Sequence, residues 1–317
     1  MPIDRADQAD DPDTPHPPAI SQRPDQTQAP DAVQGGPVDR SAAHRTYRAI
    51  VDQAYAAPRD SNSDESGDRV HITWAQALPG MRTAWKEHQE QYPSREHAAP
   101  RTHADGSWSS GDRQLSGAQN TEASEAHADI RAEGERDILP ALRRVEAADP
   151  DRHLAGLDHM IKGADRLKEK IAERLRYHPD QTPGQAASDV PDAVRFTLEY
   201  SEARYTTGVL ADVDRLKEEG FELLKLKNLW SKEQYKGINS QWRTPETGLR
   251  FEVQFHTPES RDAKELTHEA YERLRDPLTS KAEEAALEAY QRRVNAQIGT
   301  PPDVFTIEDY PPEKRDA

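Results

Sequence analysis

The sequence predicts an α+β fold for the second half of the chain, preceded by a long polar region. Segments in which apolar and polar residues alternate, as in strands, lie between segments with an apolar residue every three or four positions, as in helices. Both kinds of segment occur within residues 128–298, whereas residues 1–127 are rich in polar residues and proline. We therefore expect a mixed sheet flanked by helices over 128–298, a largely disordered region before it, and a polar tail over 299–317.

The composition excludes several classes of protein. No apolar run reaches the roughly 18 residues that cross a bilayer, and we expect no secretory signal peptide because no apolar segment follows the first residues. The chain has no cysteine, which excludes disulfides and thiolate chemistry and fits a cytoplasmic protein. Its net charge of -16 disfavours broad binding to nucleic acid or to an anionic membrane.

The first 127 residues contain two segments with helical spacing, at 42–57 and 70–92, the second interrupted by Pro79-Gly80. The stretches at 1–40 and 93–126 show no periodicity, so we expect disorder in the first and a linker in the second. Short apolar segments in such surroundings are typical of docking elements or of caps on a neighbouring domain. We therefore expect this region to have a protein partner.

The segment 154–175 is predicted to be an amphipathic helix, because its apolar residues lie in one arc at 100° per residue. Three cations share a second arc at i, i+4 and i+8: Lys162, Arg166 and Lys170. The stripe has two interpretations, an exposed solvated face or a clamp for a polyphosphate. The residues alone leave both open.

Predicted helices and strands continue on both sides of this segment. A helix broken or bent at Pro140 comes before it, and a strand over 192–200 follows it. A helix over 205–219 leads to a strand over 221–230, an order compatible with a crossover unit. A short strand then forms a hairpin with the strand over 249–255.

The strand over 249–255 has the most regular alternation in the chain. Its apolar residues are Leu249, Phe251, Val253 and Phe255, and the intervening polar residues, with the next position, are Arg250, Glu252, Gln254 and His256. The polar side is either a solvated face or a row of functional groups. Two helices complete the domain, over 259–275 and 278–298, and the first carries Lys264, His268 and Glu272 along one side.

The motifs of several enzyme classes are missing from the sequence. It has no Gly-rich phosphate loop, no His-Glu-x-x-His and no Gly-x-Ser-x-Gly. What remains is carboxylates on strands and cations on a helix. Two carboxylates on one sheet face suit Mg²⁺, and such a site beside a basic clamp indicates phosphoryl or nucleotidyl transfer.

Residues 154–275 resemble the RelA/SpoT-type nucleotide pyrophosphokinase (alarmone synthetase) domain. The motifs that carry the resemblance, in the family's order, are Lys162–Ile171, Asp192–Arg195, Tyr235–Asn239 and Glu252–Thr257. The resemblance implies a nucleotidyltransferase-like sheet. It also implies transfer of diphosphate from ATP to the 3′-hydroxyl of a purine nucleotide, giving a product of the (p)ppGpp or (p)ppApp type.

The resemblance further implies roles for individual residues. Asp192 and Glu252 would hold Mg²⁺, and Glu252 would also take the proton of the 3′-hydroxyl. Lys236 and Gly237 would lie at the acceptor nucleotide. The whole implied substrate-binding set is Lys162, Arg166, Lys170, Arg195, Lys236, Gly237, Asn239, Gln254, His256 and His268.

Departures from the family pattern leave the metal site and the acceptor open. Asp192 is closer to the following arginine than in the family, so Asp189 is an alternative ligand. Ile238 replaces the family's stacking tyrosine, and Trp242 replaces a usual histidine. The acceptor need not carry guanine, because Tyr235 or Trp242 could stack on a different base.

One further departure is His256, which stands where an arginine is common. No hydrolase block precedes the domain in this sequence, so we expect an enzyme that only synthesises its product, and unregulated synthesis would make it a toxin. Alternatives are pyrophosphorylation of tRNA 3′ ends, a catalytically inactive module that senses nucleotide, and a structural protein without a site.

Overall fold

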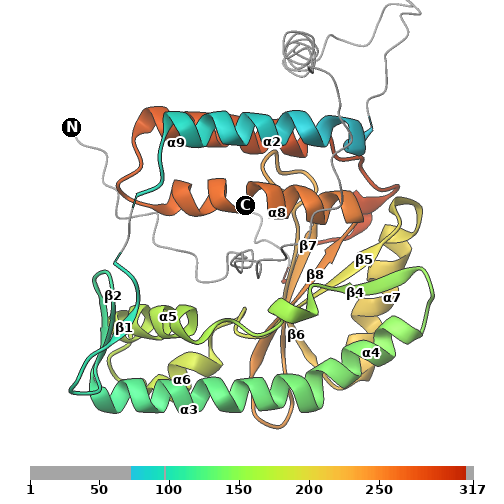
Figure 1. Cartoon of the computed structure of the whole chain (residues 1–317). Helices are drawn as coiled ribbons and strands as arrows, with labels where there is room; N and C mark the ends of the chain where they lie inside the picture. The colour runs from blue at the N-terminus through green and yellow to red at the C-terminus, as the bar shows by residue number, and fades with distance from the viewer. Residues whose placement is uncertain (1–72, 96–97, 312–317) are drawn as a thin grey trace, which may run out of the picture. The chain divides into compact units, whose positions relative to one another are not determined.

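The computed structural model describes residues 73–95 and 98–311 (Figure 1). The helix predicted at 42–57 and the disorder predicted over 1–40 lie outside these residues. The described residues divide into two units, and the boundary falls within one helix, after Glu265. Unit 1 contains the described residues of 94–265 and 299–311, and unit 2 those of 73–93 and 266–298.

Unit 1 contains a five-stranded mixed sheet in the order β4-β5-β8-β7-β6. Its strands are β4 (Arg152–Ala155), β5 (Arg195–Tyr200), β6 (Glu222–Asn228), β7 (Ile238–Arg243) and β8 (Arg250–His256). β5 and β8 are parallel, and the other neighbouring pairs are antiparallel. The mixed α+β class is therefore confirmed. The connection from β5 to β6 is a crossover that passes two strands, β8 and β7.

Helices surround this sheet, and several of them pack on one another. They are α3 (Gly117–Glu133), a π-helical turn (Gly134–Ile138), α4 (Leu139–Ala147), α5 (Ala164–Tyr177), α6 (Pro183–Ser188), α7 (Tyr205–Glu218) and α8 (Pro258–Arg275). The helix predicted to break or bend at Pro140 is interrupted just before it, by the π-helical turn, and Pro140 lies in the first turn of α4. α8 is the helix that the unit boundary divides.

The central strand β8 is covered on both sides. On its apolar face the Tyr205 hydroxyl of α7 donates to the Phe255 carbonyl at 2.7 Å. On its polar face Lys264, in the first half of α8, donates to Gln254. Glu252 and Gln254 are 2% and 0% exposed. The interpretation of this strand as half-buried with a solvated polar face is therefore wrong.

The amphipathic helix predicted over 154–175 is shorter than expected. Helix α5 begins only after Gly163, its N-cap residue, while Leu154 belongs to β4 and pairs with β5. Between them the chain turns at Gly156, which has a φ of 64°. Pairing of residues 152–155 with β5 outweighs the helical spacing of their apolar side chains. Lys162 consequently precedes α5, and the prediction of three cations on one helix is wrong.

The linker predicted over 93–126 is also wrong. This stretch contains a three-stranded antiparallel sheet and the first part of α3; the strands are β1 (Arg101–Thr102), β2 (Trp108–Ser110) and β3 (Arg113–Leu115). Its first turn includes Asp105-Gly106, with a φ of 80° at the glycine. Ser116 and Gln119 form a capping box that starts α3. Asp-Gly and Ser-x-x-Gln are short local signals that an argument from periodicity misses.

The small sheet packs against α5. The indole of Trp108 is 1% exposed and donates to Asp165 at 2.9 Å, and the Ser110 hydroxyl donates to Glu169 at 2.7 Å. Asp165 and Glu169 are one turn apart on the helix. These two contacts fix which side of α5 faces the small sheet.

Part of the predicted polar tail is packed as well. Leu226 of β6 exchanges backbone hydrogen bonds of 2.7 and 2.9 Å with Tyr310, and Asp309 accepts from the Asn228 amide at 2.8 Å. Val304, in a 3₁₀ turn, is fully buried. Up to residue 311 the predicted tail therefore covers the outer edge of the sheet, where unpaired backbone groups would otherwise be exposed.

Unit 2 is a helical cluster. Its described elements are α2 (Trp74–Gln91), the second half of α8 and α9 (Lys281–Asn295). The Trp85 ring lies 5.1 Å from both His88 and Tyr290, and the Arg273 guanidinium lies over it at 5.4 Å. The helix predicted near 70–92 is therefore present, and it continues through Pro79 without a break.

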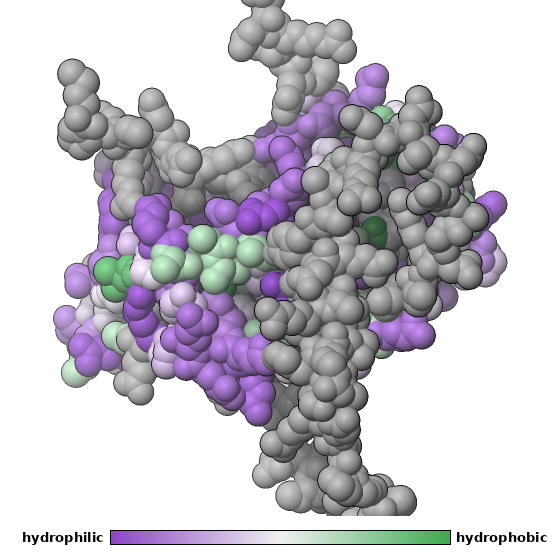
Figure 2. Space-filling model, turned by 90° about the horizontal axis from the view of Figure 1, so that it is seen from above, coloured by the Kyte–Doolittle hydropathy of each residue, from purple (hydrophilic) through white to green (hydrophobic). Residues whose placement is uncertain are grey.

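Hydrophilic side chains predominate among the coloured residues on the face shown in Figure 2. Among the described residues, the exposed large apolar side chains are Tyr177, Leu210, Leu278, Phe305 and Tyr310. Within 73–95 and 98–311, none of the helices combines the length and the apolar character needed to cross a bilayer.

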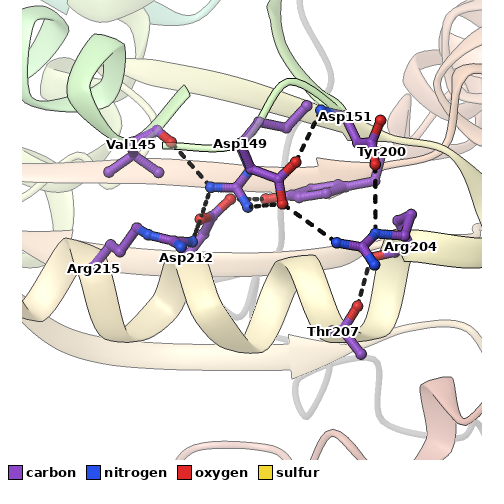
Figure 3. Close-up of polar contacts among 9 residues, drawn as sticks. Val145, Asp149, Asp151, Tyr200, Arg204, Thr207, Asp212 and Arg215 are labelled. Carbon is purple, nitrogen blue, oxygen red and sulfur yellow. Dashed lines mark hydrogen bonds and ion pairs between the residues drawn. The ribbon is translucent and has the colours of Figure 1, made fainter. Parts of the chain in front are cut away.

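A buried ionic network joins four elements of unit 1 (Figure 3). Arg152 of β4 donates to Asp212 of α7 at 2.5 Å and to the Val145 carbonyl of α4 at 3.0 Å. Asp212 also accepts from the Tyr200 hydroxyl of β5 at 2.7 Å and from Arg215 at 2.7 Å. Arg152 and Asp212 are 2% and 0% exposed, so the network replaces the water that both charges lose.

We expect Arg152→Met to lower the free energy of unfolding by about 3 kcal/mol, because the buried Asp212 loses its principal cation. Urea denaturation measures this. The control is Arg144→Met, which removes an exposed arginine paired with Glu219 and should leave stability nearly unchanged. Equal effects of the two substitutions would contradict a stabilising role for the buried network.

Candidate active site

Backbone hydrogen bonds hold three distant segments side by side. The Lys162 amide donates to the Ala193 carbonyl at 3.0 Å, and the Glu252 amide donates to the Val194 carbonyl at 2.9 Å. The turn that contains Asp192 therefore lies between the residue before α5 and the start of β8. In this way the structure brings together three of the residues named from the sequence, Lys162, Asp192 and Glu252.

Asp192 and Glu252 form a buried acidic pair, 3% and 2% exposed. Lys162 donates to Asp192 Oδ2 at 2.7 Å. Burial raises the pKa of Glu252 to about 7, Arg195 and Lys264 oppose this shift, and the negative charge of Asp192 adds to it. A carboxyl group with such a pKa can exchange a proton at neutral pH, as a general base must.

Lys264 belongs to the same cluster, although it was not among the predicted site residues. It is 5% exposed, and it donates to Gln254 Oε1 while the Gln254 amide group donates to Glu252 Oε1. Burial lowers the pKa of Lys264 to about 7. The sequence did contain a signal for Lys264. It lies one helical turn before His268, on the polar side of a predicted helix whose other face is apolar.

Several predicted residues lie outside this cluster. Arg166 is exposed and pairs with Glu169 at 3.0 Å, and Asp189, the alternative metal ligand, pairs with Arg174 at 2.6 Å. His268 lies in the part of α8 that belongs to unit 2. The phosphate clamp, of which Arg166 and Lys170 are the helical members, stays a prediction.

A second polar cluster follows along β7 and β8. The Tyr235 hydroxyl donates to Asn239 Oδ1 at 2.8 Å and lies 3.0 Å from His256 Nε2. The other ring nitrogen of His256 lies 2.9 Å from the Ser260 hydroxyl. Burial, followed by the positive charge of Lys264, lowers the pKa of His256 well below its ordinary value. The imidazole is therefore neutral at pH 7.

The loop with Lys236 and Gly237, predicted to lie at the acceptor, makes contacts within unit 1. A Cβ on Gly237 would lie 2.7 Å from His256 Cε1, so the glycine makes room for that ring. The Lys236 ammonium donates to the Trp230 carbonyl at 2.8 Å. Trp242 is fully buried in the apolar layer of the sheet. The expectation that Trp242 stacks on a base is therefore wrong.

The acidic pair is the feature that suits a metal ion. In the part of the chain that the structure describes, no three His, Asp or Glu side chains are grouped to hold one. Asp192 and Glu252 supply oxygen donors, and their mutual repulsion appears in the raised pKa of Glu252. A divalent cation relieves such repulsion, so these residues fit Mg²⁺ with further ligands from water or phosphate.

No family model matches the chain, and neither does any curated protein. Among solved structures, smu.1046c from Streptococcus mutans UA159 is 14% identical over 52% of this chain and 86% of that chain, with a TM-score of 0.38. A GTP pyrophosphokinase family protein from Streptococcus pneumoniae is 12% identical over 53% and 85%, with a TM-score of 0.35. Small alarmone synthetase 2 from Bacillus subtilis is 14% identical over 54% and 89%, with a TM-score of 0.35.

The last two names belong to the class of protein that the sequence motifs resemble.

The pH dependence of stability should report on His256. Below pH 6.5 the unfolded chain gains a proton at this position and the folded chain does not, so stability falls as the pH falls. Between pH 7.5 and pH 5.5 we expect the unmodified chain to lose about 1 kcal/mol more than His256→Gln. Urea midpoints at the two pH values measure this difference. His153→Gln, at an exposed position, should behave as the unmodified chain, and parallel curves for all three would refute the prediction.

We expect Gly237→Ala to lower the free energy of unfolding by about 1–3 kcal/mol, because the added methyl group overlaps the His256 ring. Gly163→Ala is the matched control, since its Cβ would meet nothing within 4 Å. Thermal or urea unfolding of both variants measures the difference. If the Gly237 variant were as stable as the Gly163 variant, the close approach of His256 would not constrain this loop.

Proposed function

We propose that this protein is a nucleotide pyrophosphokinase. It transfers the β,γ-diphosphate of ATP to the 3′-hydroxyl of a purine nucleotide. The observation that carries the proposal is the buried pair of Asp192 and Glu252, with Lys162 and Lys264 beside it. Acidic and basic groups buried together in this way are costly for stability, and they are typical of sites where charge is handled during a reaction.

The proposed step forms one bond and breaks one. The acceptor's 3′-oxygen attacks the β-phosphorus of ATP, the bond from that phosphorus to the bridging oxygen of the α-phosphate breaks, and AMP leaves. Glu252 takes the hydroxyl proton. Gln254 already donates to Oε1 of this carboxylate, so Oε2 is the oxygen that faces the acceptor in our proposal.

The cations of unit 1 have the charge needed to hold the polyphosphate. Lys162 is fixed beside the acidic pair by its bond to Asp192, and Arg166 and Lys170 follow it on α5. Arg195 lies opposite Glu252 in the β5–β8 ladder. Positioning and charge neutralisation provide most of the catalysis in this class of reaction, so these residues need not take part in proton transfer.

Mg²⁺ is the cofactor that we propose, with Asp192 and Glu252 as its protein ligands. When bound, it would neutralise charge on the phosphate oxygens. The residues around it hold and orient the carboxylates: Lys162 contacts Asp192, and Gln254 contacts Glu252.

The test is to incubate the full chain with ATP, Mg²⁺ and GDP, GTP, ADP, ATP or AMP, and to identify products by mass spectrometry. We expect a 3′-pyrophosphorylated nucleotide, and Glu252→Gln should slow its formation at least about a hundredfold because the base is lost. Asp189→Asn is the control and should retain activity, because this carboxylate pairs with Arg174 outside the acidic pair.

Failure to form product with any acceptor, or an equal rate in Glu252→Gln, would refute the proposal. Labelled tRNA in the same assay tests the 3′ end of tRNA as acceptor. Nucleotide binding without turnover, measured by calorimetry, would indicate an inactive sensing module. Because unregulated synthesis depletes ATP, expression of an active chain should arrest growth, and the Glu252→Gln chain should not.

A further inference from the structure

One buried contact chain in unit 1 includes a residue, Lys264, that was not among the site residues predicted from the sequence. It runs from Lys264 on α8 to Gln254 and then to Glu252, both on β8. All three side chains are at most 5% exposed. The chain ends on the carboxylate that the proposed function uses as its base, so the inference below rests on that function.

With Glu252 ionised and Lys264 protonated, the order of donors and acceptors along this chain is fixed. A carboxylate accepts hydrogen bonds, and a lysine ammonium only donates them. The Gln254 amide satisfies both neighbours in one orientation, with its NH₂ group toward Glu252 and its oxygen toward Lys264. Rotated by 180°, it would place oxygen against oxygen at one end and NH₂ against ammonium at the other.

Within β8, only the Glu252 carboxylate orients this amide. Glu252 and Gln254 are two residues apart on one strand, so their side chains share a face, but the amide can rotate about its last bond. The fixed donor has to come from another element, and the first half of α8 supplies it through Lys264. Removing this donor would leave the amide oxygen buried without its present partner.

We propose that Lys264 is a positioning residue for the reaction: through Gln254 it holds the Glu252 carboxylate with Oε1 occupied and Oε2 directed to the acceptor hydroxyl. Lys264 does not touch the reacting atoms in this arrangement. Its effect on the rate therefore passes through Gln254, and this distinguishes it from a cation that binds phosphate directly.

The experiment is a double-mutant cycle on the full chain: Lys264→Met, Gln254→Leu and the two together. Each is assayed for kcat and for KM of ATP with the best acceptor, and the unfolding free energy of each is measured in urea. We expect Lys264→Met to lower kcat about tenfold with KM for ATP changed less than twofold. The double variant should be no slower than Gln254→Leu alone, because both substitutions break the same chain.

The control for loss of a lysine is Lys217→Met, an exposed residue of α7 paired with Asp214, which should leave kcat unchanged. Rate losses that multiply in the double variant would overturn the inference, as would a loss confined to KM or a Lys264→Met rate within twofold of the unmodified chain. A fall in kcat that is matched by partial unfolding under assay conditions would assign Lys264 a structural role and would also overturn it.

The two proposals fail in different ways. An unmodified chain without product refutes the proposed function and this inference with it. An active unmodified chain with an additive cycle refutes the inference alone.

Discussion

Two buried carboxyl groups that repel each other are the constraint on which unit 1 depends. Asp192 and Glu252 have lost nearly all contact with water, and like charges in such surroundings cannot both persist without nearby cations. Lys162 meets Asp192 directly, and Lys264 and Arg195 act on Glu252. These cations come from the residues before α5, from α8 and from β5. Those three elements must therefore be in place for the pair to exist.

The remaining parts of unit 1 support these elements. The small sheet β1-β2-β3 holds α5 through contacts to Asp165 and Glu169, and the segment ending at residue 311 closes the edge at β6. On the opposite side of the main sheet, α7 packs on the apolar face and joins β4 and β5 through Asp212. Both faces of β8 are consequently covered, which explains why this strand is buried from Phe251 to His256 although polar and apolar residues alternate along it.

The two buried ionic clusters of unit 1 differ in how far the charge of the carboxylate is compensated by neighbouring groups. Burial raises the pKa of Asp212 as well, but its one carboxylate meets two arginines and a tyrosine hydroxyl, which oppose that rise. At Glu252 a second carboxylate is present, and the pKa is raised to about 7. The first arrangement stabilises a fold. The second retains a titratable group near neutral pH, and it is the arrangement that a proton-transfer site requires.

Periodicity in the sequence was sufficient to predict the α+β class, most helices and strands of unit 1, and the strand that carries Glu252, because side-chain spacing follows directly from helix and strand geometry. The motifs also singled out Lys162, Asp192 and Glu252, which the structure places side by side and whose roles stay predictions. Strand pairing and short turns decided three other features: the start of α5, the small sheet and the packing of residues 299–311. In these places contacts with distant segments outweigh the local periodicity of the side chains. Lys264 and the place of Trp242 could be assigned only from the tertiary structure, since which face of an element is buried, and against which partner, depends on contacts that no single segment contains.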